Sequence, residues 1–302
     1  MSIIGLVNTD TGSQHPYEPG TTDNILINTN GKNMVNQREA TTVAHNSYGF
    51  DRWRMNSRDS IARVISQESG SARLTITDKG TAISGVFYQD IENHTLYRGK
   101  TLTLSVRMRA TNGSIIYIAD VPGQASIAYY TTPGEWQTLN VTYTIQSNSV
   151  YVRSACHANV FNDGDYVEFE WIKLEEGDHA TPYVIPDPAL ELARCQRYFQ
   201  AYGGSAATLP ISNSYNLNTT QARGVFHFVE TMRTAPSISI SNAAHFSINH
   251  QDTNVAATNL AFNDIYKDAA YITATASGLT AGQGSAILAT STDARIFLNA
   301  EI

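Results

Sequence analysis

Apolar and polar side chains alternate with a period of two along much of residues 24–185. In residues 101–110, Thr, Ser and Arg fill every second position, and the positions between them are Leu102, Leu104, Val106 and Met108. Such alternation is typical of antiparallel strands that bury one face and leave the other in water. About eight or nine such segments follow one another, separated by turn signals such as TNG, TPGE and NDGD. The pattern predicts a jelly-roll β-sandwich over residues 24–185.

Residues 186–204, PDPALELARCQRYFQAYGG, interrupt the strand pattern and predict a connecting helix. Asp187 is a favourable N-cap and Pro188 suits the first helical position, whereas Gly203 and Gly204 would end the helix. The apolar stripe of this helix is predicted to comprise Leu192, Cys195 and Phe199. We expect the stripe to pack on the parent sandwich or on the equivalent helices of symmetry-related chains.

Residues 205–302 return to short alternating segments and close on the strand-like run ARIFLNAEI. They predict a second, smaller β-sandwich. Residues 1–23 are instead dense in Asn, Asp, Thr, Gly and Pro, and form either a floppy end or an arm that docks on a partner. The predicted fold is therefore all-β: an N-terminal arm, a jelly-roll β-sandwich, a short connecting helix and a C-terminal β-sandwich.

The strand-like segment DYVEFEWIKLE, residues 165–175, predicts two distinct faces. One face is expected to carry Val167, Phe169, Trp171 and, in the same register, Lys173. The other face is expected to carry Tyr166, Glu168, Glu170 and Ile172. Two carboxylates on one face could serve a glycosidase or bind calcium, although two solvated carboxylates on a wet strand are the simpler interpretation.

Composition narrows the functional classes. Charged residues make up only 16% of the 302 residues, and the net charge is −7 at pH 7. The chain therefore lacks the clustered Lys and Arg that binding to nucleic acid requires. No apolar run of about 18 residues predicts a membrane span, and the first residues lack a secretory signal. Cys156 and Cys195 are too few for a disulfide framework or a zinc site, so we expect buried free thiols in a protein made in a reducing cytoplasm.

Signatures of catalysis or metal binding are absent or weak. The sequence has no GxSxG, HExxH, P-loop or GxGxxG motif. The EEGD segment at residues 175–178 could bind calcium but is more typical of a tight turn. His227, His245 and His250 would form a metal site only if symmetry-related chains brought them to a common axis. We therefore expect no enzymatic activity, no cofactor and no metal.

Aromatic side chains are the strongest candidates for ligand contact. Exposed aromatic faces stack on sugar rings, although tyrosine is also an ordinary residue of sheet cores and edges. Candidates in or beside the predicted strands include Tyr88, Tyr97, Tyr117 and Tyr151. The candidates singled out for contact with a glycan are Tyr129, Tyr130 and Trp136.

Two groups of motifs border residues 24–202. The opening group is the NILIN run of residues 24–28, followed by Gln37, Arg38, Tyr48, Asp51, Arg52 and Trp53. The closing group is LEEG, ATPY and ELxxCQRYF, with Glu175, Glu176, Gly177, Cys195, Gln196, Arg197, Tyr198 and Phe199. These motifs resemble the borders of the carbohydrate-binding-type jelly-roll module of tailed-phage fibres and related virion proteins. Residues 28–33, NTNGKN, depart from the NGDF or NPNF that often follows the first strand in that family.

The resemblance implies a non-catalytic virion structural protein: a homotrimeric tail fibre or receptor-binding protein, made in the host cytoplasm. The arm at residues 1–23 would dock on other virion proteins, and the unmatched C-terminal sandwich would face a host surface glycan or protein. Neither nucleic acid nor membrane insertion is implied. A capsid decoration or head-fibre protein is the alternative, and a polysaccharide depolymerase using Glu168 and Glu170 is a third hypothesis.

Overall fold

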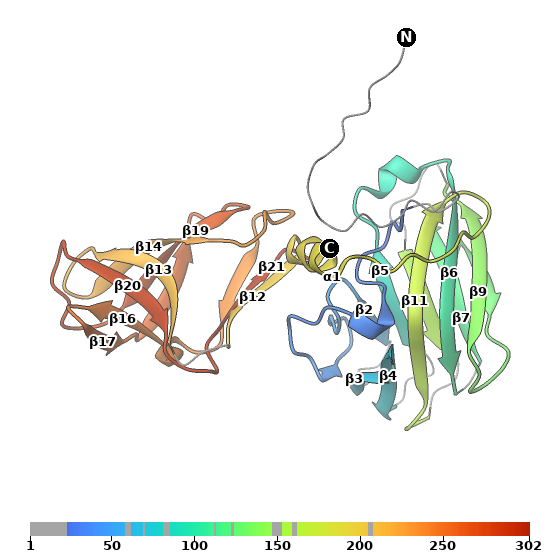
Figure 1. The fold of residues 1–302 in the computed structure, drawn as a ribbon, viewed down its shortest axis with the longest axis horizontal. Helices are drawn as coiled ribbons and strands as arrows, with labels where there is room; N and C mark the ends of the chain where they lie inside the picture. Colours follow the sequence, from blue (N-terminus) through green and yellow to red (C-terminus); the bar gives the residue numbers. More distant parts are fainter. Residues whose placement is uncertain are drawn as a thin grey trace, which may run out of the picture.

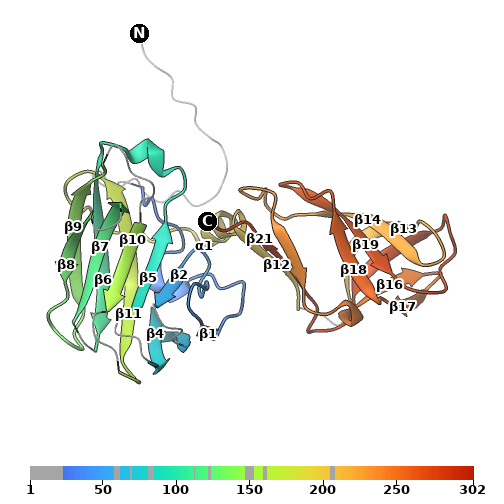
Figure 2. The ribbon, with the colours of Figure 1, turned by 180° about the vertical axis from the view of Figure 1, so that it is seen from behind.

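The chain forms two β-sandwiches joined by one short helix, as a computed structural model shows (Figures 1 and 2). The structure describes residues 23–57, 62–68, 70–80, 85–111, 113–121, 124–146, 153–158, 162–204 and 208–302. The predicted arm at residues 1–23 therefore lies outside the described residues except for Asp23. The predicted all-β fold with a jelly-roll β-sandwich is confirmed.

The first sandwich consists of two antiparallel sheets. The six-stranded sheet has the order β1 (Thr42–Val43), β3 (Ala62–Glu68), β4 (Ser71–Asp78), β11 (Tyr166–Glu176), β6 (Thr101–Ala110) and β9 (Gln137–Thr144). The five-stranded sheet has the order β2 (Arg54–Ser57), β5 (Gly85–Asp90), β10 (Arg153–Ala158), β7 (Ser114–Val121) and β8 (Gln124–Tyr129). Two short 3₁₀ helices accompany these strands, η1 (Gly31–Asn33) and η2 (His94–Tyr97).

The core of the jelly roll lies between these sheets. The rings of Trp53 and Phe87 stack with their centres 4.7 Å apart, and Phe87 stacks on Phe169 at 5.6 Å. The predicted inward face of β6 is confirmed, since its four apolar side chains are all fully buried: Leu102, Leu104, Val106 and Met108. The period-two pattern therefore identified the side of β6 whose apolar side chains are buried between the sheets and stabilise the sandwich.

Strand β11 differs from its predicted faces because a bulge interrupts its register with β6. Phe169 pairs with Met108 and Trp171 with Arg107, so Glu170 is the extra residue. An extra residue reverses the alternation beyond it. The prediction for the second half of the strand was wrong: Ile172 joins the core, and Trp171 turns outward, where it stacks on Tyr183 at 5.1 Å.

Helix α1 (Pro188–Gln196) is shorter than predicted. The side chain of Asp187 accepts hydrogen bonds from the amides of Ala189 and Leu190, which confirms the predicted N-cap. The helix ends well before Gly203, because Phe199–Gly203 form strand β12 of the second sandwich. None of the helices in the described ranges has the length and apolarity that crossing a bilayer demands.

The packing predicted for the helix is confirmed only in part. Cys195 and Phe199 are buried, but Leu192 is 38% exposed, and the buried stripe of the helix consists of Glu191 and Cys195. Glu191 takes this place because its carboxylate accepts a hydrogen bond from the amide of Asn28 at 2.6 Å and binds Arg194 at 2.6 Å. Of the two packing partners predicted for Leu192, the parent sandwich is therefore wrong, and packing on symmetry-related helices stays a prediction.

The second sandwich begins at Phe199, earlier than predicted, and has two antiparallel sheets. The three-stranded sheet has the order β12, β21 (Arg295–Asn299) and β15 (Ser237–Ile240). The seven-stranded sheet has the order β17 (Thr253–Ala256), β16 (Phe246–His250), β20 (Gly284–Ala289), β13 (Leu209–Asn216), β14 (Gln221–His227), β19 (Ala269–Thr275) and β18 (Asn259–Asn263). A 3₁₀ helix, η3 (Ala243–His245), precedes β16.

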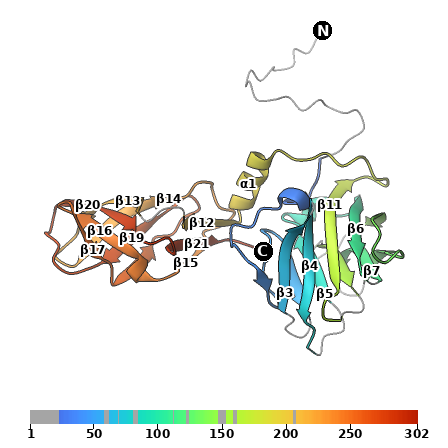
Figure 3. The same cartoon turned by 60° about the horizontal axis from the view of Figure 1, so that its bottom comes forward.

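The last strand of the chain, β21, lies next to a strand from the middle of the sequence. β21 pairs with β12, which directly follows the helix, so residues 300–302 leave the second sandwich beside the first (Figure 3). This connection places the C-terminal residues against the opening motif of the jelly roll, more than 200 residues away in sequence.

Candidate functional site

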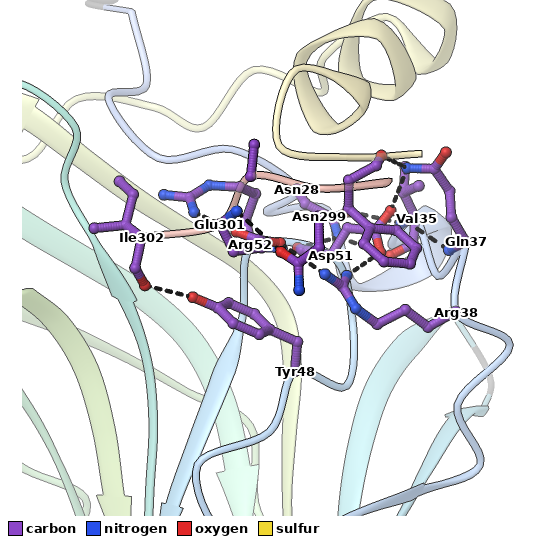
Figure 4. A network of polar contacts seen from close by, with 12 residues as sticks. Asn28, Val35, Gln37, Arg38, Tyr48, Asp51, Arg52, Asn299, Glu301 and Ile302 are labelled. Atoms are coloured by element: carbon purple, nitrogen blue, oxygen red, sulfur yellow. Dashed lines mark hydrogen bonds and ion pairs between the residues drawn. The ribbon is translucent and has the colours of Figure 1, made fainter. Parts of the chain in front are cut away.

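The opening-motif residues gather at the junction of the two sandwiches, around the carboxylate of Glu301 (Figure 4). Arg38 Nη2 lies 3.1 Å from Glu301 Oε1, and Arg52 Nη1 lies 2.6 Å from Glu301 Oε2. Arg38 Nη1 also binds Asp51 Oδ1 at 2.7 Å. Asp51, Arg52 and Glu301 have almost no solvent exposure, so these charges depend on one another for compensation.

Further contacts surround this ion-pair network. The hydroxyl of Tyr48 donates to the main-chain oxygen of Ile302 at 2.7 Å. Gln37 Nε2 donates to Asp51 Oδ2 and to the carbonyl of Phe199, both at 2.7 Å. The guanidinium of Arg38 lies 3.6 Å from the centre of the Phe199 ring. The opening motif therefore holds both the entry strand and the final residues of the second sandwich.

Local backbone geometry explains why the motif needs these residue types. Asn28 has a φ of 61°, and its side-chain amide donates to the carbonyls of Val35 and Asp51. Its own carbonyl accepts a hydrogen bond from Trp53 Nε1 at 2.7 Å. Arg52 has a φ of 71°, which aims its side chain away from the core toward Glu301. Arginine is uncommon in the left-handed backbone region because that conformation costs free energy, and the ion pair with Glu301 offsets this cost.

The junction contains a carboxyl group with a shifted pKa. Burial raises the pKa of Asp51 from its usual 3.8 to about 6, although Arg38 and Gln37 favour the ionised form. The folded protein therefore binds this proton more tightly than the unfolded chain does. The resulting stabilisation is complete below pH about 4 and is lost as the pH rises through about 6.

We expect Asp51→Asn to flatten the pH dependence of stability. The wild-type urea midpoint should contain a component that falls as the pH rises from about 4 to about 6, and the variant should lack that component. The measurement is the difference between the two midpoints across this range, not the midpoint of either protein alone. A difference that stays constant with pH would contradict the expectation.

The closing-motif residues also have structural partners. Glu175 is buried, lies 3.1 Å from the buried Lys173 ammonium, and accepts a hydrogen bond from the amide of Thr181 at 2.8 Å. Glu176 is exposed and pairs with Lys100, and Gly177 adopts a φ of 132° as β11 ends. The EEGD segment is therefore the end of a strand, and the carboxylate of its first residue, Glu175, is already bound by Lys173 and Thr181.

The CQRYF segment forms the base of the junction. The thiol of Cys195 is fully buried, and burial raises its pKa well above the usual range, which makes it an inert thiol. Arg197 binds Glu92 at 2.8 Å, and the Tyr198 hydroxyl donates to the same carboxylate. The carbonyl of Gln196 accepts from Gln200 Nε2 at 3.0 Å. The side chain of Cys156 lies outside the described residues.

The three glycan-contact candidates do not share one surface. Tyr129 is 64% exposed at the end of β8, whereas Tyr130 is 3% exposed and donates its hydroxyl to the carbonyls of Thr132 and Glu135. The prediction that Tyr130 contacts a ligand was therefore wrong, because Tyr130 is a core residue whose hydroxyl binds the loop that follows it. Trp136 directly precedes β9 of the six-stranded sheet, and the guanidinium of Arg109 lies 5.0 Å from the centre of its ring.

Tyr129 lies on the outward face of the five-stranded sheet, together with other aromatic and apolar side chains. The register aligns Arg54, Tyr88, Ala155, Tyr117 and Ile127 in one row across the strands. Tyr129 lies in the next row, opposite Ile115. Tyr88 and Ile115 are buried toward the middle of this face, and Ile127 and Tyr129 are exposed at its edge. Sequence reasoning missed Arg54 and Ile127, because only the strand register shows that they share a face with the tyrosines.

The carboxylates considered for catalysis have different environments. Glu168 is fully buried and binds Arg73 at 2.9 Å, Arg109 at 2.8 Å and the hydroxyl of Ser71. Burial alone would raise its pKa, but the hydrogen bonds from these residues hold the pKa below its usual value. Glu170 is half-exposed and lies 3.3 Å from Arg107. The interpretation of Glu168 as a solvated carboxylate was therefore wrong.

The histidines considered as metal ligands lie apart. His227 is exposed at the end of β14, His245 belongs to η3, and His250 is buried next to the amide of Asn216 at 3.2 Å. Within the ranges that the structure describes, no group of at least three His, Cys, Asp or Glu side chains is placed to hold a metal ion.

No protein-family model matches this chain, and no curated protein does. Among solved structures, a carbohydrate-binding module titled "CBM4 structure and function" is 22% identical, over 42% of this chain and 88% of its own, with a TM-score of 0.33. A family 61 module solved with β-1,4-galactotriose is 12% identical, over 41% of this chain and 88% of its own, with a TM-score of 0.31. The enzymatically active domain of tailspike protein 4 from bacteriophage CBA120 is 10% identical, over 49% of this chain and 21% of its own, with a TM-score of 0.36.

Proposed function

We propose that this chain is a non-catalytic attachment protein of a tailed-phage particle that binds carbohydrate on the host surface. The single observation that carries the proposal is the aromatic face of the five-stranded sheet, where Tyr129 and Ile127 are exposed next to Tyr117. Flat aromatic and apolar groups on a sheet face suit the C–H faces of sugar rings, and Arg54 offers hydrogen-bond donors at the end of the same register row.

Two features support the virion role within this proposal. The motif residues that resemble virion jelly-roll modules form the joint between the sandwiches, which suits a particle protein whose two sandwiches must keep a fixed orientation. Beside this joint lies an exposed apolar segment, with members Val184, Ile185, Leu190 and Leu192. In a homotrimer these side chains would be covered by symmetry-related copies, and three weak sites would act together.

The absence of catalysis is also part of the proposal. A glycosidase needs one carboxyl group that stays protonated near neutral pH. The two arginines around Glu168 favour its ionised form instead, and its burial keeps it from a substrate. Incubation of the protein with the polysaccharide that it binds should release no reducing ends.

Tyr129→Ala tests the proposed binding face. On a glycan array probed with the full chain, we expect the variant to bind the recognised glycans about tenfold more weakly, because one stacking ring is lost. Tyr266→Ala removes another tyrosine of nearly equal exposure from the second sandwich and serves as the control. Equal binding by both variants and the wild type would refute the role of this face.

The location on the particle needs a separate measurement. Immunogold labelling of intact phage with an antibody against residues 208–302 should mark the tail. Label distributed over the capsid would replace the tail-fibre proposal with a decoration or head-fibre role, and particles that carry no label would refute the virion role altogether.

A further inference from the structure

The outward face of the seven-stranded sheet in the second sandwich carries a separate group of exposed side chains. Tyr215 on β13 is 51% exposed and Tyr271 on β19 is 43% exposed. Between them, β14 presents Arg223 and Val225 on the same face, because its inward positions, Ala222 and Phe226, are in the core. Two tyrosines on an outward sheet face contribute nothing to the core of this sandwich.

The strand register fixes how these residues lie. Tyr215 is opposite Arg223, which is opposite Thr273, and Val225 is opposite Tyr271, which is opposite Asn263. Tyr215 and Tyr271 therefore lie two strands apart, about 10 Å across the sheet, with Arg223 between them.

The guanidinium of Arg223 is held in place by its neighbours. Arg223 Nε donates to Thr273 Oγ1 at 3.3 Å, and the guanidinium lies 5.9 Å from the centre of the Tyr271 ring. Its cross-strand neighbours Tyr215 and Thr273 are uncharged, as are Val225 and Tyr271 in the adjacent row. No carboxylate in these two rows competes for the positive charge.

We propose that this face is a second glycan site, specific for an oligosaccharide that carries a carboxylate. The tyrosine rings would stack on two sugar units, and Arg223 between them would bind the carboxylate through its remaining N–H groups. The exposed amides of Asn213 and Asn263 flank the same rows and suit sugar hydroxyls. This site is independent of the jelly-roll face and does not require that face to bind anything.

A second copy of the chain is a poorer occupant of this face. An isologous contact would bring two Arg223 side chains together, and like charges across an interface are unfavourable. A carboxylate ligand would instead complement the guanidinium. Charge therefore favours the acidic glycan over self-association.

The test compares oligogalacturonates with the same oligosaccharides after reduction of their carboxyl groups, together with other acidic and neutral glycans on one array. We expect the full chain to retain acidic glycans, and Tyr215→Ala and Tyr271→Ala each to weaken this binding about tenfold. Arg223→Gln should remove the preference for the carboxylate form over its reduced counterpart. Leu96→Ala, which removes a 66% exposed apolar side chain from the jelly roll, serves as the control and should leave this preference unchanged.

Each outcome separates this site from the jelly-roll site. Loss of acidic-glycan binding in the Tyr215 and Tyr271 variants, with Leu96→Ala unaffected, supports the second site even if the jelly-roll face binds nothing. Failure to retain any acidic glycan overturns it, as does an unchanged carboxylate preference in Arg223→Gln. A lower oligomeric state of Tyr271→Ala in light scattering would also overturn it, because the face would then be an interface between copies.

Discussion

Replacing Glu301 with Gln is expected to lower the free energy of unfolding of the jelly roll by about 3 kcal/mol and to release the second sandwich from it. The carboxylate bridges Arg38 and Arg52, and both Arg52 and Glu301 are almost completely buried. A neutral amide keeps the shape but leaves a buried guanidinium without its counter-charge, and such a loss is costly. Glu301 belongs to neither hydrophobic core, so the packing inside each folded sandwich is expected to stay intact.

Tryptophan fluorescence is well suited to this measurement. All three tryptophans of the chain, Trp53, Trp136 and Trp171, belong to the jelly roll, so their signal in urea reports on that sandwich alone. Small-angle scattering should show a wider range of distances between the sandwiches in the variant. A variant with an unchanged midpoint and an unchanged scattering profile would mean that the junction does not depend on Glu301.

A second ion pair between the sandwiches provides the matched control. Arg295 Nη2 lies 3.0 Å from Glu39 Oε2, but the Glu39 side chain is 71% exposed. Exposed pairs contribute little, so Glu39→Gln should change the free energy of unfolding by less than about 1 kcal/mol. The contrast between these two carboxylates isolates the effect of burial from the effect of charge.

The sequence singled out many residues of the junction, but it did not show that they join the two sandwiches. The opening and closing motifs were interpreted as structural, and they do meet where Gln37 donates to the carbonyl of Phe199. Glu301, which pairs with both arginines of the opening motif, lies 249 residues from Arg52 and belongs to no motif. An ion pair across two modules leaves no periodic signal in the chain. Glu301 reaches the two arginines because the final strand, β21, pairs with β12 beside the helix.

Alternation predicted the strands but failed wherever one residue changed the register. The bulge at Glu170 reversed the faces of Trp171 and Ile172, and no local signal in DYVEFEWIKLE marks that position. Tyr129 and Tyr130 are adjacent, so a period of two already required that they face opposite sides. Which of them lies in the core depends on the pairing of β8 with β7, and that pairing is a tertiary property.

The largest loss of stability is expected from Trp53→Ala, about 4 kcal/mol. Trp53 is fully buried, begins the aromatic stack that continues through Phe87 to Phe169, and donates its indole N–H to the carbonyl of Asn28. Its removal opens a cavity between the sheets and leaves that carbonyl without its donor, so both costs act together. Circular dichroism in urea measures the change.

Two further variants show which cost dominates and keep the test meaningful if Trp53→Ala fails to fold. Trp53→Phe retains a ring against Phe87 but loses the N–H donor, and should cost about 1–2 kcal/mol beyond the smaller volume. Tyr129→Ala removes an exposed ring and should cost less than about 0.5 kcal/mol. If Trp53→Phe proves as damaging as Trp53→Ala, the hydrogen bond to Asn28 rather than the aromatic stack holds the jelly roll closed, and the opening motif would then stabilise the core as well as the junction.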